Sequence, residues 1–394
     1  MDLSDEELGR LLSLDTTISS SSSRAGSTDA QKGPTPPLPT ASIRLIGYGA
    51  CGAIYSPDNA AHVFKLAKTR DGQLWNDYVQ HTRVWEAMHA FDLYHETAVP
   101  RPGGFVPAEE DEGKEDEAGD EGEERGGGGG GGGVTRGWWA RHEDLATTVA
   151  AGNNVNMPTA VLPSEKIPPL PRSLRNALIQ RFCNPADKAA ARASPGNADC
   201  LVRMYLGSYS RNSSSRFFSL RNFKLHLDQL RALHVDTRRL ARHMAGALAA
   251  MHWGARVDAR DVEFVVGSRS SSSSSSSSSL SSWTPLSSAL LNTVAPNSCT
   301  DDLLRFWLLD FNQCGDTSFD EAGVRSAVDA FWLNDPYYPR PPRGDGVEAF
   351  EGALWDAFVA RYLEVADRIL ACEEAEVRRL SRMFVTALVE GARR

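Results

Sequence analysis

Hydrophobic and polar positions along this chain follow two periods, and the changes between them outline the expected elements. Residues 61–66 alternate or are β-branched, which is typical of a strand. The segment from Gln73 to Phe91 instead repeats its apolar residues with a helical period. Residues 243–253 form a second helical pattern that ends at Gly254, and Phe306 to Leu309 is a short apolar run typical of a strand. The pattern predicts a mixed α+β chain.

A glycine-rich loop comes just before the first of these strands. Gly47, Gly49 and Gly52 form it, and Lys65 lies on the strand that follows. Glycine lets the backbone approach phosphate oxygens that a Cβ atom would obstruct. In a dinucleotide-binding fold such a loop opens a helix, whereas strand, loop and strand in succession is the context of a protein kinase. The pattern predicts a clamp for the phosphates of ATP, and a glycine-rich hairpin with an ordinary strand lysine is the alternative.

The helical segment that follows offers an acid for Lys65. In kinases a glutamate on the helix known as αC, in the small lobe, pairs with the strand lysine. Glu86 is the predicted partner, and Asp77 is the competing choice. An acid on a solvated helix face is the plain alternative for either residue.

Two further segments follow in the order that a kinase requires. Asp258 and Glu263 are separated by the five positions that separate the catalytic base from a metal-binding asparagine. Asp310 then follows a strand, in an Asp-Phe-Asn turn that is similar to the metal-binding Asp-Phe-Gly turn. We predict Asp258 as the base and Glu263 with Asp310 as ligands of Mg²⁺. Met204 and Tyr205, on an expected hinge strand, are predicted to lie near an adenine.

These motifs predict an α+β protein-kinase-like two-lobed fold, with a small antiparallel-sheet N-lobe, a mainly helical C-lobe and disordered low-complexity insertions. The expected segments are a disordered N-terminal segment with a short helix at 1–40, an N-lobe at 41–107, a disordered acidic and glycine insertion at 108–137, a family-specific insert with the hinge strand at 138–207, and a C-lobe at 208–392 with a disordered serine-rich insertion at 268–300.

Departures from an active protein kinase shape the functional hypothesis. Arg256 and Val257 stand where the His-Arg pair precedes the base, Glu263 replaces the asparagine, and Asn312 replaces the glycine of the turn. No Ala-Pro-Glu follows Asp310, which argues against docking of an extended protein substrate. We therefore predict an ATP- and Mg²⁺-dependent phosphotransferase acting on a small molecule. The alternative is a catalytically inactive pseudokinase that works as a protein-interaction or regulatory module.

Charge is concentrated in one tract. The formal net charge is −9, and the tract from 109 to 124 alone contains eleven acids and one lysine, so the remainder is close to neutral. A nucleic-acid-binding surface usually shows a basic stripe, so nucleic acid is not expected as a partner. Nucleotide is the expected ligand, and a protein partner could bind through the low-complexity segments.

Several longer stretches resemble a family of fungal proteins that carry the domain of unknown function 3669, some of them labelled as similar to zinc finger proteins. The stretches with this resemblance are 74–77, 167–172, 199–207, 217–223, 261–265, 309–314 and 334–339. They span most of the chain from about Ile43 to Phe384, and the resemblance implies no established activity.

The cysteines do not support a zinc finger. The chain has six, with no Cys-x2-Cys or Cys-x4-Cys pair, and no His-x3-5-His pair follows any of them at the spacing that tetrahedral zinc needs, so no zinc site is expected. The sequence lacks a signal-peptide pattern and an apolar run near eighteen residues. We therefore expect an intracellular protein, in cytoplasm or nucleus, without a membrane segment.

Overall fold

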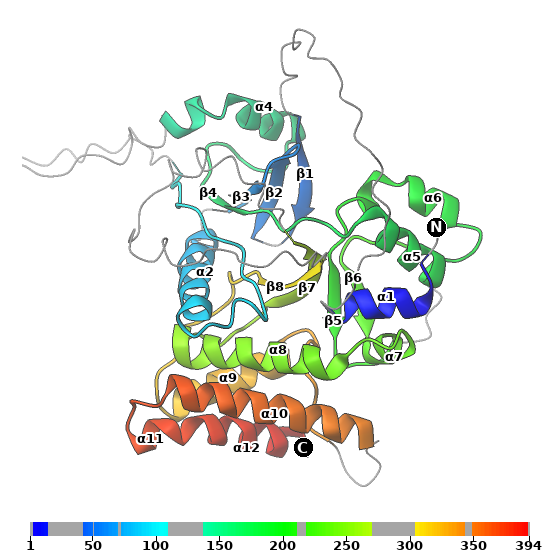
Figure 1. Cartoon of the computed structure of the whole chain (residues 1–394). Coiled ribbons are helices and arrows are strands. Elements are labelled where there is room, and N and C mark those ends of the chain that lie inside the picture. The colour runs from blue at the N-terminus through cyan, green and yellow to red at the C-terminus, as the bar shows by residue number, and fades with distance from the viewer. Residues whose placement is uncertain are drawn as a thin grey trace, which may run out of the picture.

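The computed structural model describes residues 3–14, 42–49, 51–69, 72–108, 137–210, 218–269, 304–342 and 349–392. Within these ranges the chain contains two four-stranded sheets and a set of helices, which confirms the expected mixed α+β class (Figure 1). The insertions predicted to be disordered fall largely outside the described residues.

The first sheet is antiparallel throughout and carries the glycine-rich hairpin. Its order is β1-β2-β3-β4, with bounds Ile43–Tyr48, Gly52–Pro57, His62–Ala67 and Val161–Glu165. Lys65 pairs with Ile54 on β2 and with Leu162 on β4, so it lies in the middle of the sheet. Beyond β4, Val106 forms an isolated bridge to Val161. Apolar side chains of β2 and β3 face one side, where they pack with Trp138.

The second sheet has the order β6-β5-β7-β8, with bounds Phe223–His226, Val202–Tyr205, Glu263–Ser268 and Leu304–Leu309. Strands β5 and β6 are parallel, and the other neighbours are antiparallel. The middle of β7, Phe264 to Val266, is buried because helices and loops cover both faces of this sheet. The sheet therefore lies in the main core, whereas the first sheet has a smaller apolar cluster of its own.

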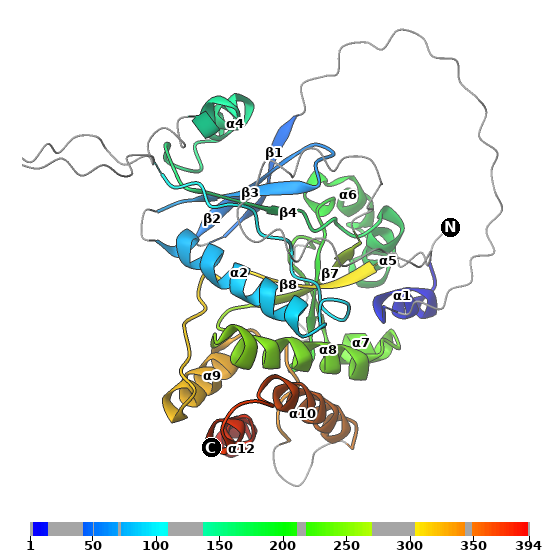
Figure 2. The same ribbon diagram turned by 60° about the vertical axis from the view of Figure 1, so that its left-hand side comes forward.

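Helix α2 (Gln73–Ala90) lies beside both sheets, and a layer of helices covers the second sheet from below (Figures 1 and 2). The layer contains α8 (Thr237–Ala249) with the π-helical turn Ala250–Ala255, α9 (Glu321–Leu333), α10 (Ala349–Ile369), α11 (Ala375–Arg378) and α12 (Leu380–Ala392). Helix α10 packs along α8. Its apolar face includes Phe358 and Tyr362, both fully buried.

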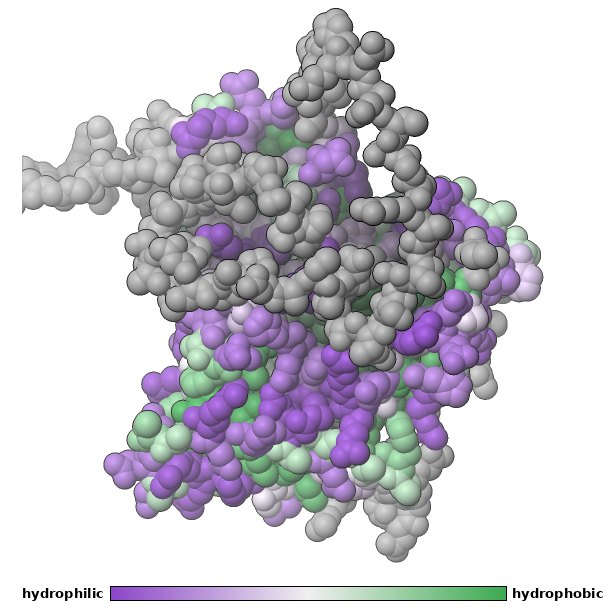
Figure 3. All heavy atoms as spheres, in the orientation of Figure 1, coloured by the Kyte–Doolittle hydropathy of each residue, from purple (hydrophilic) through white to green (hydrophobic). Residues whose placement is uncertain are grey.

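Shorter helices lie at the periphery of the molecule. Their bounds are Asp5–Leu12 for α1, Glu143–Gly152 for α4, Arg172–Phe182 for α5, Lys188–Ala193 for α6 and Leu227–Ala232 for α7, with a 3₁₀ turn at Pro195–Asn197. Helix α1 begins with a capping box between Ser4 and Glu7 and buries Leu8 and Leu12 in the main core. On the face shown in Figure 3, hydrophilic side chains over the lower helices are interrupted by small hydrophobic areas.

Candidate functional site

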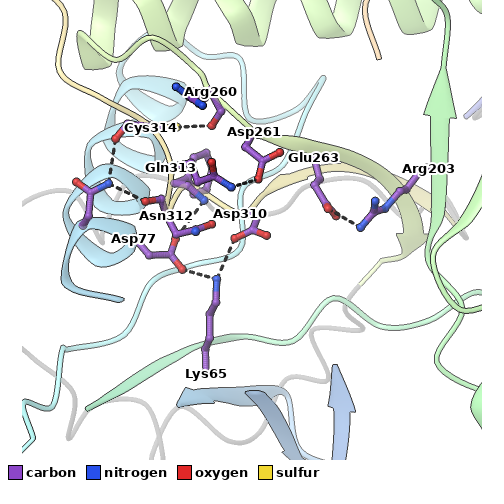
Figure 4. A network of polar contacts seen from close by, with 12 residues as sticks. Lys65, Asp77, Arg203, Arg260, Asp261, Glu263, Asp310, Asn312, Gln313 and Cys314 are labelled. Atoms are coloured by element: carbon purple, nitrogen blue, oxygen red, sulfur yellow. Dashed lines mark hydrogen bonds and ion pairs between the residues drawn. The ribbon is translucent and has the colours of Figure 1, made fainter. Parts of the chain in front are cut away.

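Lys65 is the cation at the centre of the candidate site. Its Nζ atom lies 2.7 Å from Oδ2 of Asp77 and 2.9 Å from Oδ1 of Asp310 (Figure 4). The side chain is 14% exposed. Burial alone would lower the pKa of Lys65, but the two carboxylates outweigh it and raise the pKa well above its usual value. Lys65 is therefore a fixed positive charge.

The partner of Lys65 on α2 is Asp77, which corrects the prediction of Glu86. The two acids are nine positions apart, about two and a half helical turns, so they project from opposite sides of α2. Asp77 faces β3 and is buried, whereas Glu86 is exposed to solvent. The second oxygen of Asp77 accepts a hydrogen bond of 3.1 Å from the backbone N–H of Phe311. Asp77 thus links the lysine to the turn after β8.

The turn after β8 is docked firmly against α2. Asp310 has a φ of +67°, a left-handed conformation that is uncommon for a residue other than glycine. Phe311 is fully buried and packs against the ring of His81, with 5.1 Å between ring centroids. The side-chain amide of Asn76 donates to the carbonyl oxygens of Asn312 and Cys314 at 3.0 and 2.9 Å. These contacts hold the Asp310 carboxylate toward Lys65.

Asp258, predicted as the catalytic base, supports this turn. Its carboxylate accepts hydrogen bonds from the backbone N–H groups of Arg260 (3.0 Å) and Gly315 (2.9 Å) and from the Ser326 hydroxyl (3.3 Å). The residue is 8% exposed. A carboxylate that already accepts hydrogen bonds from three donors has little acceptor capacity left for a substrate hydroxyl. The structure therefore points to a positioning role for Asp258.

Asp261, three positions later, has the exposure that Asp258 lacks. It adopts a φ of +59°, and its backbone N–H donates to Oδ1 of Asn334 at 2.6 Å. Its carboxylate accepts a 2.5 Å hydrogen bond from the side chain of Gln313. Figure 4 shows Asp261 and Asp310 on the same side of the turn. Burial, followed by the charges of Asp310 and Asp335, raises the pKa of Asp261.

Glu263, predicted as a metal ligand, lies next to Asp310 but is already paired. It is the first residue of β7, and its carboxylate forms an ion pair with the guanidinium of Arg203 from β5 (Figure 4). Burial is the main cause that raises the pKa of Glu263 to about 7. Arg203 opposes this increase, whereas Asp310 contributes to it.

Met204 and Tyr205, predicted to lie near an adenine, belong to the interior of the second sheet. Met204 is 0% exposed and Tyr205 is 2% exposed. The Tyr205 hydroxyl donates to Asp335, and its ring packs edge-on against Tyr337. The strand beside Lys65 is β4, so the chain leaves the first sheet at Glu165 and not along β5. The hinge-strand assignment is corrected accordingly.

The three glycines occupy the β1–β2 hairpin. The N–H of Gly49 donates to the carbonyl of Gly52 at 3.0 Å. A Cβ atom on Gly52 would lie 2.9 Å from the carbonyl oxygen of Leu66, so a side chain there would displace β3. A Cβ atom on Gly49 would meet nothing within 4 Å, and one on Gly47 would touch Ile54. The Lys68 ammonium contacts the Gly49 carbonyl and so ties the hairpin to the lysine-bearing strand.

Few side chains of the described residues are available to bind a metal ion. Over the described residues, no group of three or more His, Cys, Asp and Glu side chains is arranged to hold a metal ion. Mg²⁺ is commonly held by one or two carboxylates together with substrate phosphates and water. Asp310, at 32% side-chain exposure and with one oxygen on Lys65, fits that kind of partial coordination. Cys299 lies outside the described residues, and the other five cysteines are free thiols.

Comparison with known proteins gives one partial match. Residues 306–374 match the model of the family DUF3669, described as "Zinc finger protein". The matched part starts within β8, includes Asp310 and Asn334, and ends after α10. No curated protein and no solved structure matches the chain. Across the described residues, none of the helices combines the length and apolar character needed to cross a membrane.

Proposed function

We propose that this chain is a phosphotransferase with a protein-kinase-like, two-lobed fold, which moves the γ-phosphoryl group of ATP to a hydroxyl group of a small molecule with the help of Mg²⁺. The observation that carries the proposal is Lys65, held between Asp77 of α2 and Asp310 after β8. The strand that bears this lysine also packs under a glycine-rich hairpin. A strand lysine, a helix acid and a strand-end acid are the parts that position phosphates and metal in kinases.

Each group has a defined part in this proposal. Lys65 would contact the phosphates of ATP, and Gly47, Gly49 and Gly52 would let the hairpin backbone approach and cover them. Asp310 would hold the metal ion. When bound, Mg²⁺ neutralises charge that develops on the transferred group. The Asp77 carboxylate accepts hydrogen bonds from both the Lys65 ammonium and the Phe311 N–H, so it orients the lysine and the turn together.

Asp261 is the best-placed base. In the transfer step, the acceptor oxygen bonds to the γ-phosphorus, the bond from that phosphorus to the β–γ bridging oxygen breaks, and ADP leaves. The proton of the acceptor hydroxyl passes to the Asp261 carboxylate. Exposure of Asp261 and its position beside Asp310 support this role. Asp258 acts indirectly: it accepts a hydrogen bond from the Gly315 N–H and so holds the turn that follows Asp310.

The connection after Asp310 favours a small acceptor. Helix α9 begins at Glu321, so only about ten residues separate it from Asp310. Several residues of this connection already form hydrogen bonds with α2 and with Asp258. Few residues therefore remain to form a surface on which an extended peptide could bind. The absence of an Ala-Pro-Glu sequence after Asp310 agrees with this interpretation.

The second candidate is a pseudokinase that works as an interaction module. The observation that favours it is the pairing of Glu263 with Arg203, because a kinase uses the metal-binding asparagine at that position for catalysis. The replaced His-Arg pair points the same way. The two candidates differ in whether ATP is turned over, because a pseudokinase binds nucleotide without turnover or binds none.

Thermal unfolding of the full chain with and without ATP and Mg²⁺ tests the proposal. Ligand at a hundredfold over Kd stabilises by about 2.7 kcal/mol, which is a shift of several degrees for a protein of this size. Asp310→Asn should abolish the Mg²⁺-dependent part of the shift. Asp356→Asn makes the same chemical change at an exposed position of α10 and should leave the shift intact.

Phosphotransfer is then separated from binding with Asp261→Asn. This variant should keep the nucleotide-dependent shift and lose ADP formation with a panel of small hydroxyl compounds. A shift without any turnover in the wild type would favour the pseudokinase. No shift with any nucleotide would contradict the phosphotransferase and leave a pseudokinase that works as an interaction module without nucleotide.

A further inference from the structure

Arg203 is a second fixed cation at the candidate site, on the far side of Glu263 from Asp310 (Figure 4). It is placed on β5 across from Val265 of β7, so its side chain can reach the beginning of β7. There its guanidinium forms the ion pair with Glu263, while Asp335 lies 3.7 Å away on its other side. In Figure 4, Glu263 stands between Arg203 and the carboxylates of Asp261 and Asp310.

The position of Arg203 is fixed from several directions. The Asp335 carboxylate accepts a hydrogen bond from the Tyr205 hydroxyl and lies 4.0 Å from the ammonium of Lys224, so Asp335 is itself held in place. The side chains of Arg203 and Glu263 are 15% and 21% exposed. A guanidinium keeps its charge at every physiological pH, and its planar fork suits a carboxylate. This pair is therefore a permanent part of the site and not an exchangeable surface contact.

The pairing changes what Glu263 can bind. In kinases with two Mg²⁺ ions, the side chain at this position ligates the second ion. Here a cation that cannot dissociate from the site faces the Glu263 carboxylate. A divalent ion at the same carboxylate would meet the charge of Arg203 at close range, and it would also have to displace the guanidinium from its hydrogen bond.

We propose that Arg203 takes the place of a second metal ion, so that nucleotide binds with a single Mg²⁺ held at Asp310, and Glu263 serves to position Arg203. This inference rests on the proposed function, because it concerns the same nucleotide site. It assigns Arg203 as a positioning residue that sets how many metal ions the site takes.

Counting bound Mn²⁺ by electron paramagnetic resonance tests the inference without any turnover. The full chain is titrated with Mn²⁺ in the presence of a saturating, non-hydrolysable ATP analogue. We expect one Mn²⁺ per nucleotide for the wild type and two for Arg203→Met, because the freed Glu263 can then ligate the second ion. Arg203→Lys keeps a positive charge and should stay at one. Arg305→Met removes a partly buried arginine at the far end of β8 and should also stay at one.

Glu263→Gln tests the same point in a variant that keeps the shape of the side chain. If Glu263 is not a ligand, this variant binds one Mn²⁺ with an affinity within about twofold of the wild type. A wild type that binds two ions, an Arg203→Met variant that still binds one, or a tenfold loss of Mn²⁺ affinity in Glu263→Gln overturns the inference. A wild type that binds no nucleotide at all overturns the proposed function as well, which distinguishes the two failures.

Discussion

The first sheet supplies the candidate site with a cation under an open hairpin, whereas the region around the second sheet supplies its acids. Lys65 comes from the middle of β3, and the glycine hairpin beside it has open space at Gly49. Apart from Asp77 on α2, the acids come from the ends of strands and from loops, with Glu263 at the start of β7 and Asp310 directly after β8. We call Lys65 with the hairpin the cation side, and Asp258, Asp261, Glu263 and Asp310 the acid side. The cation side is a regular strand position, whereas the acid side consists mainly of constrained turns.

The acid side is constrained in ways that the cation side is not. Arg256, Ala259, Asp261 and Asp310 all adopt left-handed backbone conformations, each of which has a cost that the surrounding contacts must offset. Asn334 holds the loop through the Asp261 N–H and the Ala259 carbonyl. This difference indicates that the site depends on rigid placement of its carboxylates. Lys65 connects the first sheet to them through its two ion pairs.

The largest effect should come from removing that join. Lys65→Met leaves the buried Asp77 without its partner, and breaking a buried pair in this way costs about 3–5 kcal/mol. Urea unfolding measures the loss. Asp77→Asn added to Lys65→Met should recover part of it, because the amide oxygen can still accept from the Phe311 N–H.

Lys188→Met is the control for Lys65→Met. It removes an ammonium group from α6, on the outside of the molecule, and should change stability by less than about 0.5 kcal/mol. A loss below 1 kcal/mol for Lys65→Met would mean that the two regions are held together by other contacts.

The next effect separates the two aspartates of the constrained loop. Asp258→Ala leaves the N–H groups of Arg260 and Gly315 without their acceptor, and a buried unsatisfied donor costs about 1–3 kcal/mol. Asp261→Ala removes an exposed side chain, so we expect a loss below about 1 kcal/mol. Urea unfolding of both variants checks the order. Equal losses would show that Asp258 has no special structural part in the acid side.

The sequence predicts the local context of the site better than its long-range arrangement. The strand before Lys65 and the turn at Asp310 follow from local patterns, and the structure joins these two residues in an ion pair. Helix α2 was also expected, but its buried face contains Asp77, Gln80 and His81 beside apolar residues, and apolar periodicity alone does not mark these polar positions. Trp75, which that periodicity places inside, is 52% exposed.

Two other differences arise from pairing between distant segments and from backbone conformation. The strand at Met204 exists as expected, yet its partners β6 and β7 are set by contacts that no local pattern records. The spacing between Asp258 and Glu263 matched a catalytic loop, but left-handed residues at Ala259 and Asp261 turn the chain so that Asp258 faces inward. Counting positions cannot detect such a turn.

The smallest effect concerns pH and the helical layer below the second sheet. His252 is buried there with Nδ1 2.9 Å from the Tyr362 hydroxyl, and burial lowers its pKa to about 3. Above pH 6.5 the ring is neutral in both states, so it makes no pH-dependent contribution. As the pH falls below 6.5, the unfolded chain binds a proton that the folded chain refuses, and the free energy of unfolding decreases by up to about 1.4 kcal/mol per pH unit.

His252→Phe should remove this slope, because phenylalanine fills the site without titrating, while the Trp253 indole still donates to Tyr362. Urea unfolding between pH 6.5 and 5.5 measures the change, and His95→Phe, which removes an exposed ring, is the control. If the acid lability comes from His252, His252→Phe flattens the profile and leaves the Lys65 site unaffected. An unchanged slope would place the proton uptake by the unfolded chain at another group, with His243 of α8, whose pKa burial lowers to about 4, as the next one to test.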